Sequence, residues 1–182
     1  NLEQIIPTFS LMFVMTVEDH WQCYGDLEFT RSVARGIGPI MHWFERRMTP
    51  DGLVGFIPWW VFVDWRPEAF REGIPPESET GASTTVNLMY VGALDSGARI
   101  YRAVGDPHHA AIWEKRAEAM REAIRRTCWS EKEGLFVDGP GSTNLSQHSN
   151  VWAILTDTAT PEQTERIMKR LMSDSRLVQT TY

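Results

Sequence analysis

Apolar side chains recur at intervals of three and four residues in six segments of the chain, and this spacing places them on one face of an α-helix. The six stripes run along residues 5–24, 29–48, 86–104, 110–124, 150–156 and 160–172. The first stripe consists of Ile5, Phe9, Met12, Thr16, His20 and Tyr24. The pattern predicts six helices and an all-α fold class, in which short extended segments are confined to the loops.

Two of the connections between the predicted helices are short and contain a Gly-Asp pair. Gly25-Asp26 joins the first helix to the second, and Gly105-Asp106 joins the third to the fourth. Glycine adopts the left-handed conformation that ends many helices, and aspartate caps the start of the next helix. The sixth helix has a start signal of its own in Thr160-Pro161. The predicted helices form hairpins at about 2–48, 83–128 and 149–174.

The two remaining connections, residues 49–82 and 129–149, are long and resemble each other. Both begin with an acidic residue followed by Gly-Leu, and both then reach the tripeptide Phe-Val-Asp, which ends at Asp64 in the first loop and at Asp138 in the second. This similarity predicts a repeat of about 80 residues. If the helices run up and down, both long loops lie at the same end of the bundle, where we expect the functional residues.

Composition and charge exclude several classes of function. The chain has 182 residues, of which 42% are hydrophobic and 23% charged, and its formal net charge is −6. These values suit one globular domain or part of a larger one. The negative charge disfavours nonspecific binding to nucleic acid or to an anionic membrane. No apolar run approaches the roughly 20 residues that span a bilayer.

The sequence contains no pattern typical of a metal or cofactor site. Cys23 and Cys128 form neither a disulfide framework nor a zinc motif, and we expect both to be buried thiols. No spacing of His, Cys, Asp and Glu resembles a metal site, and no glycine-rich nucleotide motif is present. Because the chain starts at Asn1 without methionine and stops at Tyr182, we expect a piece of a longer protein and assign no cellular compartment.

The loop GFIPWWVFVDWRP at residues 55–67 gathers three indoles beside one carboxylate. Indole faces pack against the C–H faces of sugars, and a carboxylate accepts hydrogen bonds from hydroxyl groups in a fixed direction. The candidate carbohydrate contacts in this loop are Trp59, Trp60, Asp64 and Trp65. The alternative interpretation is structural, with the indoles packing the loop and the carboxylate capping it or pairing with a nearby arginine.

A second set of polar residues lies in and just after the other long loop. Asp138 ends the second Phe-Val-Asp tripeptide, and His148 and Asn150 lie where the fifth helix is expected to begin. If both long loops share one face, these three side chains face the same region as Asp64. The simpler interpretation is that Asp138 serves the fold, that His148 is an ordinary loop histidine, and that a serine or asparagine here caps the helix.

Five segments taken together resemble the catalytic domain of bacterial α-L-rhamnosidases, a glycoside hydrolase family. They are VEDHWQCYGD at 17–26, DGL…FVDW at 51–65, VNLMYVGALDSGARIYRAVGD at 86–106, EGLFVDG at 133–139 and SQHSNVWAIL at 146–155. The resemblance implies a barrel of six helical hairpins, each with an inner and an outer helix. The hairpins predicted here would form about half of such a barrel.

The resemblance also implies roles for particular residues. The aspartate of an Asp-Trp pair lines the rhamnose subsite in this family, which corresponds to Asp64 beside Trp65, and aromatic residues such as Trp59 or Trp60 surround the sugar. The family hydrolyses terminal α-L-rhamnosyl linkages with inversion, through a glutamate general acid and a glutamate general base on either side of the bond. Neither glutamate motif is found in this chain. The implied partner is therefore a rhamnose-containing glycan, no cofactor is expected, and no residue of the chain is predicted to be catalytic.

Two other functions remain as alternatives. One is a noncatalytic helical-hairpin module that binds a partner through its loops, although long aromatic loops are unusual for such a module. The other is a hydrolase or lyase on the same hairpin barrel that acts on another sugar or on a uronide, because a fold alone does not identify the substrate.

Opening a closed ring of hairpins leaves apolar flanks exposed, which monomeric proteins rarely tolerate over large areas. We expect Phe9, Met12 and Phe13 on one flank. On the other flank we expect Ile167, Met168 and Leu171. Two copies of the chain would cover these flanks by forming a homodimer of half barrels.

Overall fold

The computed structural model describes residues 4–181, and most of these residues are helical. The first three helices precede the first long loop, which contains a 3-10 turn and one short helix. A second group of helices and a two-stranded antiparallel sheet follow. The elements before residue 83 are α1 (Pro7–Tyr24), α2 (Leu27–Ala34), α3 (Ile37–Glu45), η1 (Arg71–Gly73) and α4 (Pro76–Thr80). Those after it are α5 (Thr84–Val104), α6 (Pro107–Cys128), β1 (Trp129–Ser130), β2 (Leu135–Phe136), α7 (Gln147–Leu155) and α8 (Pro161–Leu171).

The short Gly-Asp turns have the conformation that the sequence predicts. Gly25 ends α1 with φ of 67°, and the Asp26 carboxylate accepts a hydrogen bond from a backbone N–H of the first turn of α2 at 2.9 Å. Gly105 ends α5 with φ of 95°, and Asp106 caps α6 in the same way at 3.1 Å. Thr160 likewise caps α8, so all three predicted helix starts are confirmed.

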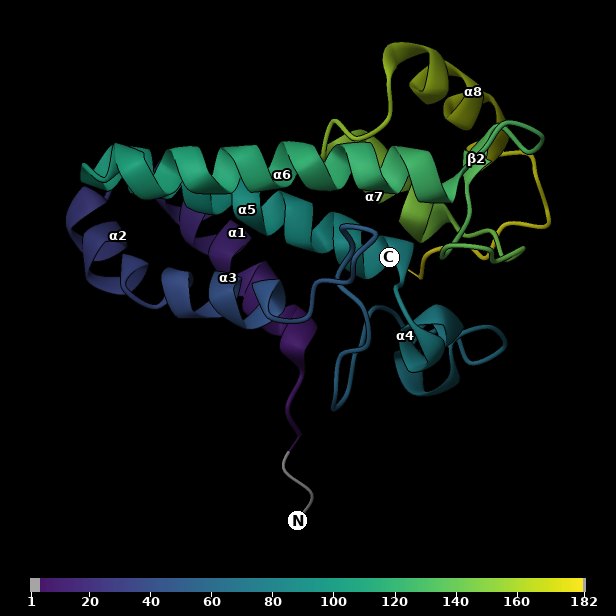
Figure 1. Cartoon of the computed structure of the whole chain (residues 1–182), viewed down its shortest axis with the longest axis horizontal. Helices are drawn as coiled ribbons and strands as arrows, with labels where there is room; N and C mark the ends of the chain where they lie inside the picture. Colours follow the sequence, from purple (N-terminus) through teal and green to yellow (C-terminus); the bar gives the residue numbers. More distant parts are fainter. Residues whose placement is uncertain (1–3, 182) are drawn as a thin grey trace.

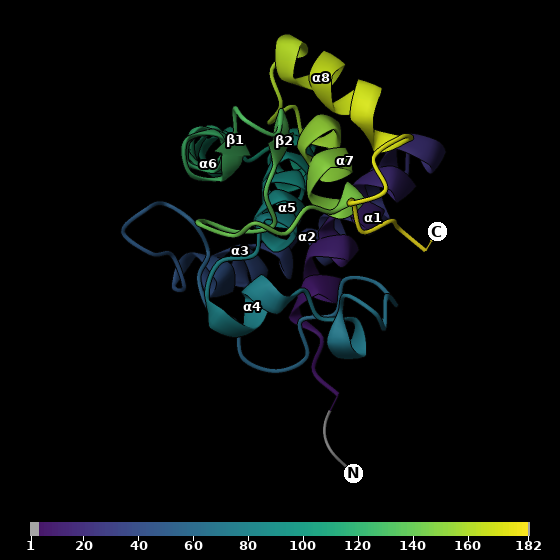
Figure 2. The ribbon, with the colours of Figure 1, turned by 90° about the vertical axis from the view of Figure 1, so that its right-hand side faces the viewer.

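The helices pair as hairpins, and α5 packs against α1, α6 and α7. In Figure 2, α1, α5 and α7 lie next to one another, while α6 and α8 lie outside them. The turns that join α1 to α2 and α5 to α6 lie toward the left in Figure 1, whereas the long loops and α4 lie toward the other end. The predicted separation of short turns from long loops is therefore present.

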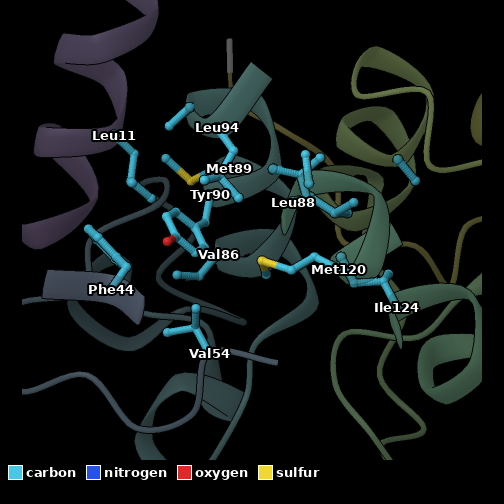
Figure 3. Packing of buried hydrophobic residues seen from close by; sticks show 14 of the residues in the cluster. Leu11, Phe44, Val54, Val86, Leu88, Met89, Tyr90, Leu94, Met120 and Ile124 are labelled. Atoms are coloured by element: carbon cyan, nitrogen blue, oxygen red, sulfur yellow. The ribbon is translucent and has the colours of Figure 1, made fainter. Parts of the chain in front are cut away.

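The core forms around α5, which contributes Leu88, Tyr90 and Leu94 to the cluster of buried side chains in Figure 3. Tyr90 is 1% exposed, its ring stacks on that of Phe44 with centroids 5.2 Å apart, and its hydroxyl donates to the backbone carbonyl of Met41 at 2.9 Å. Leu11 of α1 and Met120 of α6 close the cluster from either side. Burial of each such side chain stabilises the folded state by about 1.5–3 kcal/mol. Because α5 packs against α1, α6 and α7, it is the central element of this core.

The apolar stripe predicted on the first helix is not the face that α1 buries within the chain. Leu11, Val14 and Val17 are at most 4% exposed, whereas Phe9 and Met12 of the predicted stripe are 52% and 41% exposed. Helix α1 thus has two apolar faces, and only the unpredicted one packs against the hairpin of α5. Phe13 is exposed as well, so one of the two expected apolar flanks is present.

The second expected flank is largely absent. Ile167 and Leu171 are buried, because α8 packs against α7 and β2 within the chain. Only Met168, of the three side chains expected there, is exposed.

The expectation of two buried thiols is half wrong, since Cys128 is buried and Cys23 is exposed. None of the helices in residues 4–181 is long and apolar enough to cross a membrane.

Candidate functional site

Asp64 and His148 come from different loops and form a buried pair. His148 Nε2 lies 2.7 Å from Asp64 Oδ2, and the two residues are 5% and 3% exposed. His148 is held in the first turn of α7, which begins at its N-cap, Ser146. Asp64 is placed by the loop after α3, where Val63 N–H donates to the carbonyl of Gly73 at 2.8 Å. These two candidate residues are therefore brought together as the sequence predicts.

A third residue, Thr181, completes the environment of the carboxylate. Its backbone N–H donates to Asp64 Oδ2 at 2.8 Å, and its hydroxyl donates to the carbonyl of Trp65 at 2.8 Å. Burial alone would raise the pKa of Asp64, but hydrogen bonds from His148 and Thr181 outweigh it and lower the pKa below its ordinary value. Asp64 is thus ionised at neutral pH. Its other oxygen, Oδ1, is buried and has no hydrogen-bond partner among residues 4–181.

Asp64 and His148 line a cavity of about 330 Å³ whose other walls are mostly apolar. No lysine or arginine belongs to this lining. The cavity thus combines an extended apolar surface with one anionic group. The remaining lining residues are Phe9, Met12, Phe62, Val63, Met89, Val151, Trp152, Leu155 and Thr180.

The three tryptophans of the loop lie together, but they line a different cavity, of about 470 Å³. Trp59 and Trp65 are about half exposed, and Trp60 is fixed by a hydrogen bond from its indole N–H to the carbonyl of Glu72 at 2.8 Å. The Phe62 ring packs against Trp60 and Trp65 and also lines the cavity of Asp64. The indoles and the carboxylate therefore face two adjacent hollows on either side of Phe62.

Trp59 has a backbone conformation that is rare for a bulky residue. Its φ is 71°, in the left-handed region that favours glycine. The ring stacks on that of Trp43 with centroids 5.9 Å apart and planes inclined by 20°, yet the residue remains 54% exposed. A strained position that presents an aromatic face to solvent is typical of functional loops.

Asp138 lines a different cavity from Asp64 and supports the start of α7. Its Oδ1 accepts hydrogen bonds from the hydroxyls of Ser146 and Ser149, both at 2.6 Å. Burial raises the pKa of Asp138 above its ordinary value, and the two serine hydroxyls offset only part of this effect. Asp138 lines a third cavity of about 420 Å³, of which neither Asp64 nor His148 is part.

Asn150 is fully buried and engaged with the backbone. Its side-chain oxygen accepts from Phe136 N–H at 2.9 Å, and its amide group donates to the carbonyls of Phe136 and Ser146 at 3.0 and 2.9 Å. Both side-chain N–H groups are therefore used, which gives Asn150 a structural role. Asn87 makes the corresponding bonds to Val54 in the preceding hairpin.

These two asparagines show which residues of the long loops are equivalent. Val54 and Phe136 both follow the Gly-Leu pair, and both are bound by the asparagine of the next helix. Two residues further on, Asp138 corresponds to Phe56 and not to Asp64. The two loops are therefore equivalent at their Gly-Leu pairs. The shared Phe-Val-Asp tripeptide does not mark equivalent positions, because the first loop contains additional residues before α5.

Sequence reasoning missed Thr181 and the apolar walls contributed by α1. No local signal marks Thr181, since its contacts are with residues more than a hundred positions earlier. Phe9 and Met12 were predicted as a helix face but not as part of a site. Among residues 4–181, no group of three or more His, Cys, Asp or Glu side chains is arranged to hold a metal ion.

Comparisons with known proteins agree with this architecture. A protein-family model, the bacterial α-L-rhamnosidase six-hairpin glycosidase domain, matches residues 4–180. The crystal structure of a GH78-family rhamnosidase of Bacillus sp. GL1 is similar over 97% of the chain, with a TM-score of 0.86 and 22% identity. A rhamnosidase from Klebsiella oxytoca with rhamnose bound is similar over 98% of the chain, with a TM-score of 0.82 and 20% identity.

The chain spans 18% of the length of the Bacillus protein and 32% of the length of the Klebsiella protein. No curated protein sequence matches it. At these identities the two structures establish the fold alone, whereas the family model covers nearly every residue. The chain therefore belongs to the bacterial α-L-rhamnosidase six-hairpin glycosidase domain family, of whose domain it forms a part.

Proposed function

We propose that the chain is part of the catalytic domain of a longer glycosidase that removes terminal α-L-rhamnosyl groups with inversion. In this proposal the segment supplies sugar-binding loops, and the general acid and base lie outside it. Membership of the rhamnosidase domain family supports the substrate class. The Klebsiella relative holds rhamnose, which supports a rhamnose-containing glycan as the partner.

The observation that carries the proposal is Asp64 itself, which lines a mostly apolar cavity and whose buried Oδ1 has no hydrogen-bond partner among residues 4–181. A buried, ionised acceptor without a donor is unfavourable, and a ligand hydroxyl would supply the missing hydrogen bond. Apolar walls suit the C–H face of a sugar ring and the methyl group that a 6-deoxy sugar such as rhamnose carries in place of a hydroxymethyl group. Asp64 is thus the residue on which we place sugar recognition.

The charge of this cavity separates the proposal from the uronide alternative. A uronide carries a carboxylate, which requires a cationic or donor-rich environment when it is removed from water. No lysine or arginine lines the cavity, and the Asp64 carboxylate would repel a second anion. A neutral, partly apolar sugar is therefore favoured.

The tryptophans are proposed to bind the part of the glycan next to the recognised sugar. Trp59 and Trp65 are each about half exposed, and Trp60 packs against Trp65 and is fixed by its bond to the backbone carbonyl of Glu72. Such flat apolar faces fit a sugar ring or an aromatic aglycone. Their cavity adjoins that of Asp64 across Phe62, which suits two consecutive units of one ligand.

No residue of this chain is proposed as general acid or base. Asp64 and Asp138 are the obvious carboxylates to pair, but Asp138 is bound to two serines at the start of α7 and lines a separate cavity. An inverting pair must face one water-filled gap, with the carboxyl groups about 6.5–9.5 Å apart. Asp138 does not meet the first requirement.

A substrate panel tests the proposed function. The full-length protein is assayed with 4-nitrophenyl glycosides of α-L-rhamnose, of α-L-mannose, which adds the 6-hydroxyl group, and of a uronic acid. We expect hydrolysis of the rhamnoside, a kcat/KM for the mannoside lower by about 10–200-fold because the apolar wall rejects the hydroxyl, and no hydrolysis of the uronide. Preferred hydrolysis of the uronide, or none of any of the three, would overturn the proposal.

A further inference from the structure

We propose that His148 and Thr181 are positioning residues that orient the Asp64 carboxylate so that Oδ1 alone is left for a ligand. This inference rests on the sugar-binding role proposed for Asp64 and adds two residues to the site. Neither of them needs to touch the sugar. Their function is to set the direction in which Asp64 accepts a hydrogen bond.

The hydrogen bonds at Asp64 are divided unequally between its two oxygens. Oδ2 accepts from His148 Nε2 at 2.7 Å and from Thr181 N–H at 2.8 Å, while Oδ1 has no partner among residues 4–181. The χ2 torsion of an aspartate, about its Cβ–Cγ bond, has a broad range of values unless hydrogen-bond donors restrict it. Two charge-assisted hydrogen bonds to Oδ2 restrict this torsion and thereby fix the direction of Oδ1.

His148 is itself held firmly enough to act in this way. It is 5% exposed, and the Phe70 ring packs against the imidazole with centroids 4.9 Å apart. An ionised carboxylate only accepts, so the proton of the shared hydrogen bond lies on Nε2. Nδ1 has no partner among the residues that the structure describes, so the bond to Asp64 is the one hydrogen bond of the ring within this part of the chain, and the packing of Phe70 holds the ring in place.

Thr181 belongs to a segment that connects α7 with the tryptophan loop. Val178 N–H donates to the carbonyl of Leu145 at 2.9 Å, and Gln147 N–H donates to the carbonyl of Val178 at 2.8 Å, which fastens the segment beside the start of α7. Thr181 then bonds both Asp64 and the carbonyl of Trp65. The same segment therefore fixes the carboxylate and the neighbouring indole relative to His148.

The first test compares two replacements of His148 in the full-length protein. His148→Gln keeps an N–H donor at nearly the position of Nε2, and His148→Leu keeps bulk without a donor. We expect His148→Leu to lower kcat/KM for an aryl α-L-rhamnoside by about 10²-fold, the effect of misplacing a binding group by about 1 Å. His148→Gln should recover most of this loss.

The melting temperature of each variant separates positioning from support of the fold. If His148 only fills space, the apolar variant keeps wild-type kcat/KM and the glutamine variant has no advantage, and this result would overturn the proposal. Thr181→Val is the matched control for the segment. It removes the hydroxyl bond to Trp65 but keeps the N–H bond to Asp64, so its kcat/KM should fall less than that of His148→Leu.

The second test does not depend on any substrate. The ¹⁵N chemical shifts of the imidazoles in the 182-residue chain report which ring nitrogen carries the proton. We expect the Nε2–H tautomer for His148, and the Nδ1–H tautomer for exposed His109, whose Nδ1 lies 2.7 Å from Asp106. A proton on Nδ1 alone of His148 would overturn the positioning proposal, whereas an inactive wild-type enzyme would overturn the proposed function and leave this result standing.

Discussion

Asn87 in the first turn of α5 and Asn150 in the first turn of α7 make the same three hydrogen bonds in successive hairpins. Each side-chain oxygen accepts from a backbone N–H of the preceding loop, and each amide donates both to the carbonyl of that loop residue and to the carbonyl of its own N-cap serine. Both asparagines are completely buried. The loop that leads into each inner helix is therefore attached to the helix in the same way.

This equivalence predicts that Asn87→Ala and Asn150→Ala are similarly destabilising. Each replacement leaves buried backbone groups without partners, which costs about 1–3 kcal/mol per group. Urea unfolding of the 182-residue chain measures the loss. An Asn150→Ala variant that unfolds like the wild type would show that these bonds do not stabilise the fold. Asn150 would then again be a candidate for ligand contact.

The ion pair between Glu18 of α1 and Arg99 of α5 predicts a dependence of stability on pH. Burial alone would raise the pKa of Glu18, but hydrogen bonds from Arg99, Ser96 and Gln22 outweigh it and lower the pKa below its ordinary 4.5. The Glu18 carboxylate then binds a proton more readily in the unfolded chain than in the folded chain. The stabilisation by Glu18 is present above about pH 4.5 and is lost as the pH falls through the folded pKa.

The measurement is the free energy of unfolding from about pH 6 to about pH 3 for the wild type and for Glu18→Gln. We expect the wild type to lose more stability over this range than the variant, because glutamine has no charge to lose. Arg102→Gln is a suitable control, since Arg102 pairs with Glu114 at the exposed surface, where ion pairs contribute little. Parallel pH profiles for wild type and Glu18→Gln would refute the assignment.

Much of the fold follows from local sequence. Gly25 and Asp26 define a helical hairpin turn by their own conformational preferences, so this turn was predictable from two residues. The packed face of α1 was not, because the helix is apolar on two sides and only the tertiary arrangement decides which side is buried. The stripe that includes Phe9 and Met12 lies on the exposed side, where one apolar flank is expected.

The candidate site was predicted in part, for a comparable reason. The unusual composition of the tryptophan loop points to Asp64, and the resemblance to a family supports it. The partnership of Asp64 with His148 and Thr181 has no local signal, because it forms only when loops distant in sequence meet. The repeated Phe-Val-Asp tripeptide was misleading, since Asp138 and Asp64 occupy different positions relative to the helices.

The exposed face of α1 bears on the homodimer of half barrels, which stays a prediction. Phe9, Met12 and Phe13 form an apolar flank, and two copies of the chain would cover it by contact. We expect sedimentation equilibrium at micromolar concentration to show species larger than the 20.9 kDa monomer. Met12→Ser with Phe13→Ser should shift the protein toward monomer, and a wild type that remains monomeric at high concentration would contradict the prediction.

The isolated chain is predicted not to hydrolyse aryl α-L-rhamnosides at a useful rate. General acid and general base groups each contribute about 10²–10⁴-fold, and both are expected outside this segment. A sensitive fluorogenic rhamnoside assay of the purified 182-residue chain measures the rate. Turnover that Asp64→Asn or Asp138→Asn abolishes would show that the acid and base lie within the chain after all.

The most direct test of the account compares Asp64→Asn with Asp138→Asn in the full-length protein, with kcat/KM for an aryl α-L-rhamnoside as the measurement. Both variants replace a buried carboxylate by an amide of the same size. Because Asp64 is proposed to accept from the sugar through Oδ1 and Asp138 only supports α7, Asp64→Asn should lower kcat/KM by about 10²-fold and Asp138→Asn by no more than about threefold. Equal kcat/KM values for Asp64→Asn and the wild type, or a larger loss in Asp138→Asn, would contradict the assignment of sugar recognition to Asp64.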